Sequence, residues 1–182
     1  MHFYFTRHGQ TFWNVSNQIC GATDIGLTDE GYQQAQACAR LIAKEYPDIS
    51  LILTSPLSRA YETARVISEY TGIPFMVEER LKEQNFGIFE STPRDSKEFH
   101  EAKKNFCDRF GTGESMIQVG ARIFSLLDDL YQDTDHTILL VAHNGIARHI
   151  EAYFHSMNNE EFSSFGIRKC EVRRYDFPIE KD

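Results

Sequence analysis

The sequence predicts a single α/β domain, a three-layer sandwich in which a mainly parallel sheet carries helices on both faces. Three observations support this prediction. Short hydrophobic segments alternate with segments of helical period along the chain, as expected when crossover helices connect parallel strands. Residues 49–53 and 138–141 are nearly unbroken apolar runs, which is typical of strands buried on both faces. The 182 residues contain no internal repeat or linker, so we expect one domain over 1–182.

The first half of the chain predicts three strands and two helices. An aromatic run over 2–6 predicts the first strand. Thr28 is a suitable N-cap for a helix over about 29–46, which Pro47 ends. A buried strand over 49–54 follows. A helix over 57–70 ends before Gly72, and a short strand covers 73–77.

The second half begins with a segment that lacks a regular period. Residues 81–113 mix polar and aromatic side chains with Pro93, Gly111 and Gly113, so we expect a loop with one charged helix near 96–106. Residues 84–114 would form a short cap over a pocket. A helical period returns over 115–131, the most hydrophobic strand covers 137–142, and a helix over 145–155 precedes a final strand over 170–177.

Charge and composition exclude several classes of function. The 19 Lys and Arg against 27 Asp and Glu give a formal net charge of -8, which argues against nonspecific binding to nucleic acid or acidic membranes. No apolar run approaches the roughly 20 residues that span a bilayer, and the first residues lack the features of a secretory signal. The four scattered cysteines favour free thiols. We therefore expect a cytoplasmic protein, and the sequence leaves its oligomeric state open.

Polar residues follow three predicted strands at the points where these strands end. Arg7 and His8 follow the first, Ser55 and Arg59 the second, and His143 the most hydrophobic one. Ligands of such sheets bind beyond the carboxyl ends of the strands. Guanidinium groups match the oxygens of a phosphate, and a neutral imidazole can attack phosphorus to form a phosphohistidine. These residues predict a phosphate site with a nucleophilic histidine.

Phosphoryl transfer also requires a proton for the departing oxygen, so a carboxylic acid should lie near the phosphate site. Four glutamates follow the strand that ends at Val77, and their spacing does not choose among them: Glu78, Glu79, Glu83 and Glu90. A metal site is not expected, because His143, His149 and His155 are six residues apart and do not share a helical face.

Four ordered motifs resemble those of the histidine phosphatase superfamily, also called the phosphoglycerate mutase-like family. Residues 7–11, Arg-His-Gly-Gln-Thr, with Asn14 resemble its first motif. Residues 54–60 with Thr63 and Ala64 are similar to its second arginine motif. Residues 81–83 with Phe86, Gly87 and Glu90 are similar to its acid-bearing loop. Residues 141–143 with Gly145 and Arg148 are similar to its second histidine motif.

The resemblance implies roles for the site residues. His8 would be the phosphorylated nucleophile and Glu83 the proton donor, which later acts as a base toward water. Arg7, Arg59 and His143 would hold the phosphoryl oxygens, with Asn14 completing the pocket, and we add the neighbouring Asn144 to this phosphate-binding set. The resemblance implies no metal and no organic cofactor. Arg94, Lys97, Lys103 and Lys104 lie in the segment that would cover the pocket and are candidates for substrate contact.

Two positions depart from the pattern of the family. Asn144 follows His143, and Ser91 follows Glu90, where the family usually has glycine. Asn tolerates the left-handed backbone region better than most residues, so we expect Asn144 to be compatible with the pocket.

The favoured function is a metal-independent phosphatase that hydrolyses small phosphate monoesters, with a small phosphorylated metabolite as its partner. The first alternative is a phosphoglycerate mutase, an isomerase that uses the same histidine. The second is a catalytically inactive phosphate-binding module. Family mutases that depend on a bisphosphate primer are generally longer, with basic and proline-rich segments around the pocket. The stretch from Glu83 to Glu114 is brief and contains only Pro93, which favours hydrolysis. The physiological substrate is left open.

Overall fold

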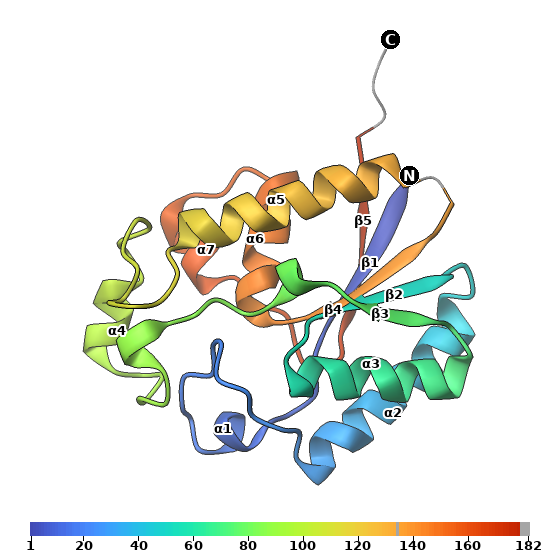
Figure 1. Ribbon diagram of the computed structural model, residues 1–182, viewed down its shortest axis with the longest axis horizontal. Helices are drawn as coiled ribbons and strands as arrows, with labels where there is room; N and C mark the ends of the chain where they lie inside the picture. The colour runs from blue at the N-terminus through green and yellow to red at the C-terminus, as the bar shows by residue number, and fades with distance from the viewer. Residues whose placement is uncertain (134, 179–182) are drawn as a thin grey trace.

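A five-stranded sheet with the order β3-β2-β4-β1-β5 forms the centre of the molecule. The computed structural model describes residues 1–133 and 135–178 (Figure 1). The strands are β1 (His2–Arg7), β2 (Leu51–Thr54), β3 (Phe75–Val77), β4 (Ile138–Ala142) and β5 (Val172–Asp176). The pairs β1–β4, β4–β2 and β2–β3 are parallel, and only β5 runs antiparallel, beside β1. This arrangement confirms the predicted mainly parallel sheet.

Helices cover both faces of the sheet, which confirms the three-layer prediction (Figure 1). On one face, α2 (Asp29–Glu45) and α3 (Ser58–Thr71) pack on Tyr4, Ile52 and Leu139. On the other face, α5 (Met116–Gln132) and α6 (Asn144–Phe154) pack on Phe3, Phe5 and Leu140. Successive residues of a strand point to opposite faces, so the run Phe3-Tyr4-Phe5 supplies both cores.

Most element boundaries agree with the sequence prediction, and the differences have local causes. β2 begins at Leu51 rather than at residue 49, because Ile49 still belongs to the turn that follows α2. Two short helices were not predicted, α1 (Phe12–Val15) and α7 (Asn159–Ser164). Each is fixed by a capping box, around Thr11 and Asn158 respectively, and is too short to show a hydrophobic period.

Residues 84–114 lie beyond the end of the sheet and contain two short helices, η2 (Gly87–Phe89) and α4 (Lys97–Ala102). The predicted charged helix is thus present but shorter than expected. The turn η1 (Glu79–Leu81) leads into this segment from β3. A separate aromatic cluster holds it together, formed by Ile19, Phe86, Phe99 and Phe110 with Phe89 beside them.

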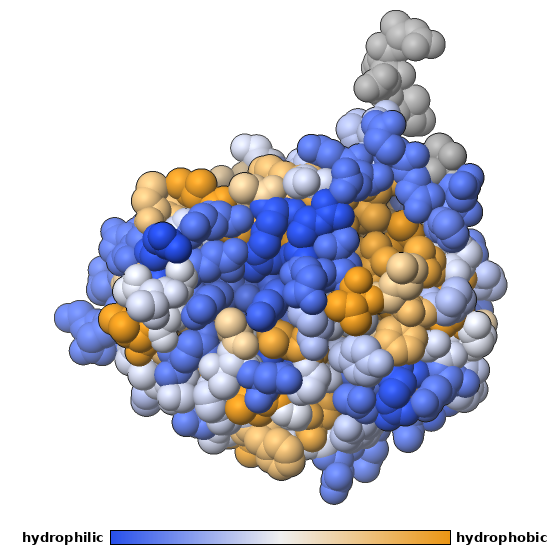
Figure 2. Space-filling view, viewed as in Figure 1, coloured by the Kyte–Doolittle hydropathy of each residue, from blue (hydrophilic) through white to orange (hydrophobic). Residues whose placement is uncertain are grey.

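The space-filling view shows hydrophilic residues over the centre of one face (Figure 2). Hydrophobic residues gather toward the side of β3, where Met76 and Val77 are exposed. None of the helices in the described part of the chain combines the length and the apolar character needed to cross a bilayer.

Ser91 adopts a left-handed backbone conformation, with a φ of 66°. Its N–H donates to the carbonyl of Ile19 at 3.0 Å, which joins the 84–114 segment to the loop before the first cysteine. The usual glycine of the family would avoid the cost of this conformation, about 1–2 kcal/mol for a residue with a side chain. The departure at this position therefore costs stability locally.

We expect Ser91→Gly to raise the free energy of unfolding by about 1 kcal/mol or less, because glycine relieves the left-handed strain but gains entropy in the unfolded chain. Ser91→Val should lower it by about 1–2 kcal/mol, since a β-branched residue tolerates positive φ poorly. Urea denaturation measures both values. Equal stabilities of the two variants would contradict the left-handed assignment.

Candidate functional site

The parallel register brings three strand ends to one edge of the sheet. Arg7 pairs with Ala142 and Thr54 with Val141, so the residues that follow these strands are neighbours. The N–H of His8 donates to the carbonyl of Ala142 at 3.0 Å, and that of Ser55 donates to the carbonyl of Val141 at 3.1 Å. The rings of His8 and His143 have their centroids 5.2 Å apart. The predicted convergence of the three strand exits is present in the structure.

His8 is held with one ring nitrogen engaged and the other free. Nδ1 lies 2.6 Å from the carbonyl oxygen of Gly9, so in the neutral ring Nδ1–H donates and Nε2 carries the lone pair. Nε2 has no hydrogen-bond partner among the described residues. Burial lowers the pKa of His8 well below its usual value, and the charges of Arg59 and Arg7 lower it further. The imidazole is therefore neutral near pH 7, as a nucleophile must be.

His143 and Arg59 form a buried pair behind His8. Nε of Arg59 donates to Nδ1 of His143 at 3.3 Å, and Nε2 of His143 lies 2.7 Å from Oγ of Ser55. Since Arg is always a donor, Nδ1 of His143 is the acceptor and Nε2–H donates to Ser55. Burial, followed by the charge of Arg59, lowers the pKa of His143 well below its usual value. Both histidines of the site are thus neutral.

The remaining contacts of Arg59 fix the loop over residues 21–23. Its NH1 donates to the carbonyl of Thr23 at 2.9 Å, and its NH2 donates to that of Gly21 at 2.6 Å. The side chain is fully buried. A guanidinium has three nitrogens that carry N–H donors, and these contacts with the one to His143 engage all three of them.

Arg7 contacts the start of α6 and the loop before β5. Its NH1 donates to the carbonyl of Ile167 at 3.0 Å and lies 3.5 Å from Oδ1 of Asn144. Its Nε is the one buried side-chain nitrogen or oxygen in the described residues without a hydrogen-bond partner. Burial lowers the pKa of Arg7 to about 10. A buried donor without an acceptor favours an anion at this place.

The reason given for expecting Asn144 to be compatible with the pocket does not apply in the structure. Asn144 is the first residue of α6 and is not among the residues with positive φ, so its tolerance of the left-handed region is not used. Its Oδ1 accepts from the N–H of Ile167 at 3.0 Å. The side chain thereby ties the start of α6 to the loop that holds Arg7.

Among the four candidate acids, only Glu83 borders the same cavity as His8. Its carboxylate accepts from the N–H of Gly145 at 3.0 Å and from its neighbour Gln84 at 2.9 Å. Glu78 pairs with Arg80 at 2.8 Å, and Glu79 is exposed. These contacts distinguish Glu83 from Glu78 and Glu79, which the sequence spacing left as equal candidates for the acid beside the phosphate site.

Glu90 instead binds the backbone of a neighbouring loop. Its carboxylate accepts from the N–H groups of Gly21, Ala22, Thr23 and Phe86 and from the hydroxyl of Thr23, at 2.6 to 3.3 Å. This is the loop whose carbonyls accept from Arg59. Glu90 therefore shapes the site from outside the cavity.

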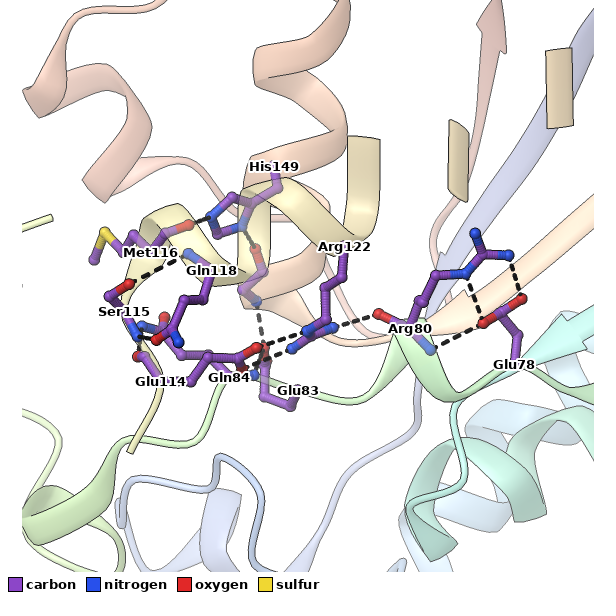
Figure 3. Close-up of polar contacts among 11 residues, drawn as sticks. Glu78, Arg80, Glu83, Gln84, Glu114, Ser115, Met116, Gln118, Arg122 and His149 are labelled. Carbon is purple, nitrogen blue, oxygen red and sulfur yellow. Dashed lines mark hydrogen bonds and ion pairs between the residues drawn. The ribbon is translucent and has the colours of Figure 1, made fainter. Parts of the chain in front are cut away.

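A polar network holds the backbone on either side of Glu83 (Figure 3). The side chain of Gln84 donates to the carbonyl of Glu114 at 2.9 Å. Arg122 binds the Glu114 carboxylate through two bonds, at 2.8 and 2.9 Å, and also donates to the carbonyl of Arg80. His149 contacts the carbonyls of Gly145 and Met116 at 2.9 and 3.0 Å. The acid-bearing loop is thus fastened to both α5 and α6.

The cavity has a volume of about 110 Å³ and contains five of the seven predicted site residues in its wall: Arg7, His8, Asn14, Glu83 and Asn144. Arg59 and His143 lie behind this wall rather than in it. Asn14 accepts from the N–H of Thr11 through Oδ1 at 3.1 Å, which leaves its amide NH₂ for a ligand.

Three further cations line the cavity, Arg94, Lys103 and Arg148. The first two were only candidates for substrate contact, since they come from the 84–114 segment, whose conformation the sequence did not predict. Arg148 belongs to the second histidine motif, and its position five residues after His143 was the available signal. Within residues 1–133 and 135–178, no three His, Cys, Asp or Glu side chains are grouped as metal ligands.

The chemical capacity of the site follows from these contacts. A neutral imidazole with a free Nε2, a carboxyl group and several cations border one small cavity. Such a set can bind a phosphoryl group, accept it covalently and exchange a proton with the oxygen on its other side.

Comparison with known proteins agrees with this description. The model of the histidine phosphatase superfamily (branch 1) matches residues 3–181. A probable phosphoglycerate mutase, GpmB, from Yersinia pestis (strain Pestoides F) is 29% identical over 182 residues, which cover 96% of this chain and 84% of the relative.

Solved structures show the same fold. Bacillus stearothermophilus YhfR superposes with a TM-score of 0.85 at 26% identity, covering 97% of this chain and 91% of that one. A mycobacterial glucosyl-3-phosphoglycerate phosphatase has a TM-score of 0.82 at 26% identity, covering 95% and 88%. Because the family model spans nearly the whole sequence, the chain belongs to branch 1 of the histidine phosphatase superfamily.

Proposed function

We propose that the protein is a phosphatase that hydrolyses small phosphate monoesters through a phosphohistidine at His8. The observation that carries the proposal is the state of the His8 ring. Gly9 fixes Nδ1–H and leaves the lone pair of Nε2 free, and His8 lines the same cavity as Glu83. The cavity of about 110 Å³ suits a small ester rather than a polymer. Relatives whose names denote phosphatases support the same class of reaction.

The reaction proceeds in two balanced steps. Nε2 of His8 forms a bond to phosphorus while the bond to the ester oxygen breaks, and protonated Glu83 gives its proton to that oxygen. The Glu83 carboxylate then takes a proton from water, whose oxygen attacks phosphorus and releases His8. Arg7, Asn14 and Asn144 line the cavity around the phosphoryl oxygens. Arg59 and His143 contact each other behind this wall and support the site from there. Charge-assisted donors stabilise the transition state most where water is excluded.

A phosphoglycerate mutase is the second candidate, and the named relative GpmB supports it. A mutase returns the phosphoryl group to its substrate instead of to water. The short 84–114 segment favours hydrolysis, because a small cap shields the phosphohistidine less from water.

Phosphate release from an aryl phosphate tests the proposal. We expect turnover by the wild-type protein and a loss of at least about 10³-fold in His8→Ala, since removing a nucleophile removes the covalent route. His155→Ala, at an exposed histidine, is the matched control. Absence of phosphate release from a broad panel of esters would contradict the phosphatase, and faster conversion of 3-phosphoglycerate to its 2-isomer would establish the mutase.

The close contact between Gly145 and Glu83 gives a second prediction. A Cβ at position 145 would overlap with Oε1 of Glu83, so Gly145→Ala should displace the carboxyl group and lower kcat/KM by about 10²-fold. The loss should be greater for alkyl phosphates than for aryl phosphates, because only poor leaving groups need the proton.

Gly120→Ala is the control, since the nearest atom to its Cβ would be Cδ2 of His149 at 3.5 Å. Equal losses for alkyl and aryl esters in Gly145→Ala would argue against Glu83 as the proton donor.

The pKa of His8 gives a third prediction. Burial and the adjacent cations lower the pKa of His8 well below its usual value, so the ring should stay neutral as the pH falls through 6.5, where an unperturbed histidine gains its proton. A ¹⁵N NMR titration should show Nδ1 protonated and Nε2 unprotonated down to pH 6. Protonation of Nε2 at or above pH 6.5 would contradict the assignment.

A further inference from the structure

Two of the four cysteines meet beside the last residues of β1. Cys38 lies on the buried side of α2 and is only 2% exposed, whereas Cys170 is half-buried in the turn before β5. Cys170 packs against the core cluster that contains Cys38, and the two thiols are hydrogen-bonded to each other. Of the other two cysteines, Cys20 contacts the carbonyl of Thr23 at 3.9 Å and Cys107 is exposed. The fold thus pairs two thiols that are far apart in the sequence.

Each cysteine of this pair is fixed by its own contact with β1. Successive side chains of a strand alternate between the two faces, so Thr6 lies on the same face as Tyr4, and its Oγ1 is 3.9 Å from Sγ of Cys38. The N–H of Cys170 donates to the carbonyl of Arg7 at 2.9 Å. Cys170 has a φ of 58°, a left-handed conformation that is unfavourable for a residue with a side chain. These contacts hold it there and place the two sulfurs next to each other.

The turn that contains Cys170 also supports the wall of the cavity. The carbonyl of Ile167 accepts from NH1 of Arg7, and the N–H of Ile167 donates to Oδ1 of Asn144, both at 3.0 Å. Arg7 and Asn144 line the cavity. A movement of Cys170 would therefore be transmitted to the cavity wall through the backbone of residues 167–170.

We propose that Cys38 and Cys170 form an oxidation site, at which a peroxide converts the two thiols into a disulfide and thereby weakens the binding of phosphate. One sulfur, as its thiolate, attacks an oxygen of hydrogen peroxide. An S–O bond forms, the O–O bond breaks, and the departing oxygen takes the thiol proton and leaves as water. The other sulfur then attacks the sulfenic acid, so that the S–S bond forms, the S–O bond breaks and a second water leaves. The thiols lose two electrons and two protons, and the peroxide accepts both.

Two features of the pair favour this reaction. The hydrogen bond from the Cys170 thiol lowers the pKa of Cys38, and the thiolate is the reactive form of cysteine. Cys170 is half-buried rather than fully enclosed, which leaves the pair open to a reagent as small as a peroxide. The second thiol is already in place, so a sulfenic acid formed at either sulfur has a neighbour that can resolve it.

The disulfide would displace the turn before β5. The sulfurs of a disulfide are about 2.05 Å apart, closer than two hydrogen-bonded thiols can lie. Cys38 is fixed within the 17-residue helix α2, so we expect most of the movement at Cys170. Misplacement by about 1 Å at a contact that positions a site can cost about 10²-fold. The effect on phosphate binding rests on the phosphate site of the proposed function, whereas formation of the disulfide does not.

Peptide mapping under non-reducing conditions tests the oxidation site. After treatment of the wild-type protein with hydrogen peroxide, mass spectrometry should find the peptide with Cys38 joined to the peptide with Cys170, with the loss of two hydrogen atoms. Dithiothreitol should separate them again.

Phosphate binding is measured in a Cys20→Ser/Cys107→Ser background, which retains only the proposed pair. Cys20 lines the cavity, so its oxidation must be separated from that of the pair. Calorimetric titration with inorganic phosphate should show a Kd about tenfold or more higher after oxidation, because the support of Arg7 has moved. Reduction with dithiothreitol should restore the original Kd.

Cys38→Ser and Cys170→Ser in the same background are the matched controls, since each retains one thiol and cannot form the disulfide. Their Kd for phosphate should be the same before and after peroxide. Thermal unfolding checks that both variants are folded, and the wild-type mapping tests the disulfide without any substitution.

Two thiols that stay reduced, or disulfides that form only between molecules, would overturn the oxidation site. A disulfide between Cys38 and Cys170 that leaves the Kd unchanged would overturn its effect on phosphate binding, as would an equal rise of the Kd in the single-thiol variants. A reduced protein that does not bind phosphate would contradict the proposed function, and the mapping result would still decide the oxidation site.

Discussion

The parallel pairing of β1, β4 and β2 is the constraint on which the site depends. It aligns the last residues of three strands, so that His8, His143 and Ser55 emerge side by side although they are far apart in the sequence. A shift of one residue in a strand would turn its side chains to the other face. The buried cores on both faces of the sheet fix the register, and the geometry of the site follows from them.

Burial then determines the chemistry of the aligned residues. Two imidazoles beside buried guanidinium groups stay neutral, because desolvation and like charges both oppose protonation. The carbonyl oxygen of Gly9 accepts from Nδ1–H of His8 and thereby leaves Nε2 as the free ring nitrogen. The formal net charge of -8 describes the whole chain and conceals this local arrangement, since most surface arginines are paired with acids while those in the cavity are not. The basic pocket and the acidic surface are thus compatible.

Much of this site could be predicted from the sequence, because it consists of residues next to strands that their hydrophobicity reveals. His8, Arg7 and His143 needed only the positions of the strand ends. Residue spacing left Glu83 and Glu90 equivalent, and only the family resemblance chose Glu83. The physical difference between them lies in the fold, since the contacts of Glu90 with residues 21–23 join segments almost 70 residues apart. The sequence likewise did not show that α6 begins at Asn144, which places this residue in the first turn of the helix.

The 84–114 segment was the least predictable part, because an aromatic cluster rather than a regular period organises it. It is also where Arg94 and Lys103 approach the cavity.

The most direct test of the central claim is the identity of the phosphorylated atom during turnover. After a rapid quench in alkali, in which phosphohistidine survives, mass spectrometry and ³¹P NMR of the labelled peptide should place the phosphoryl group on Nε2 of His8. Continued turnover with no label on His8, or a label on another side chain, would contradict the account.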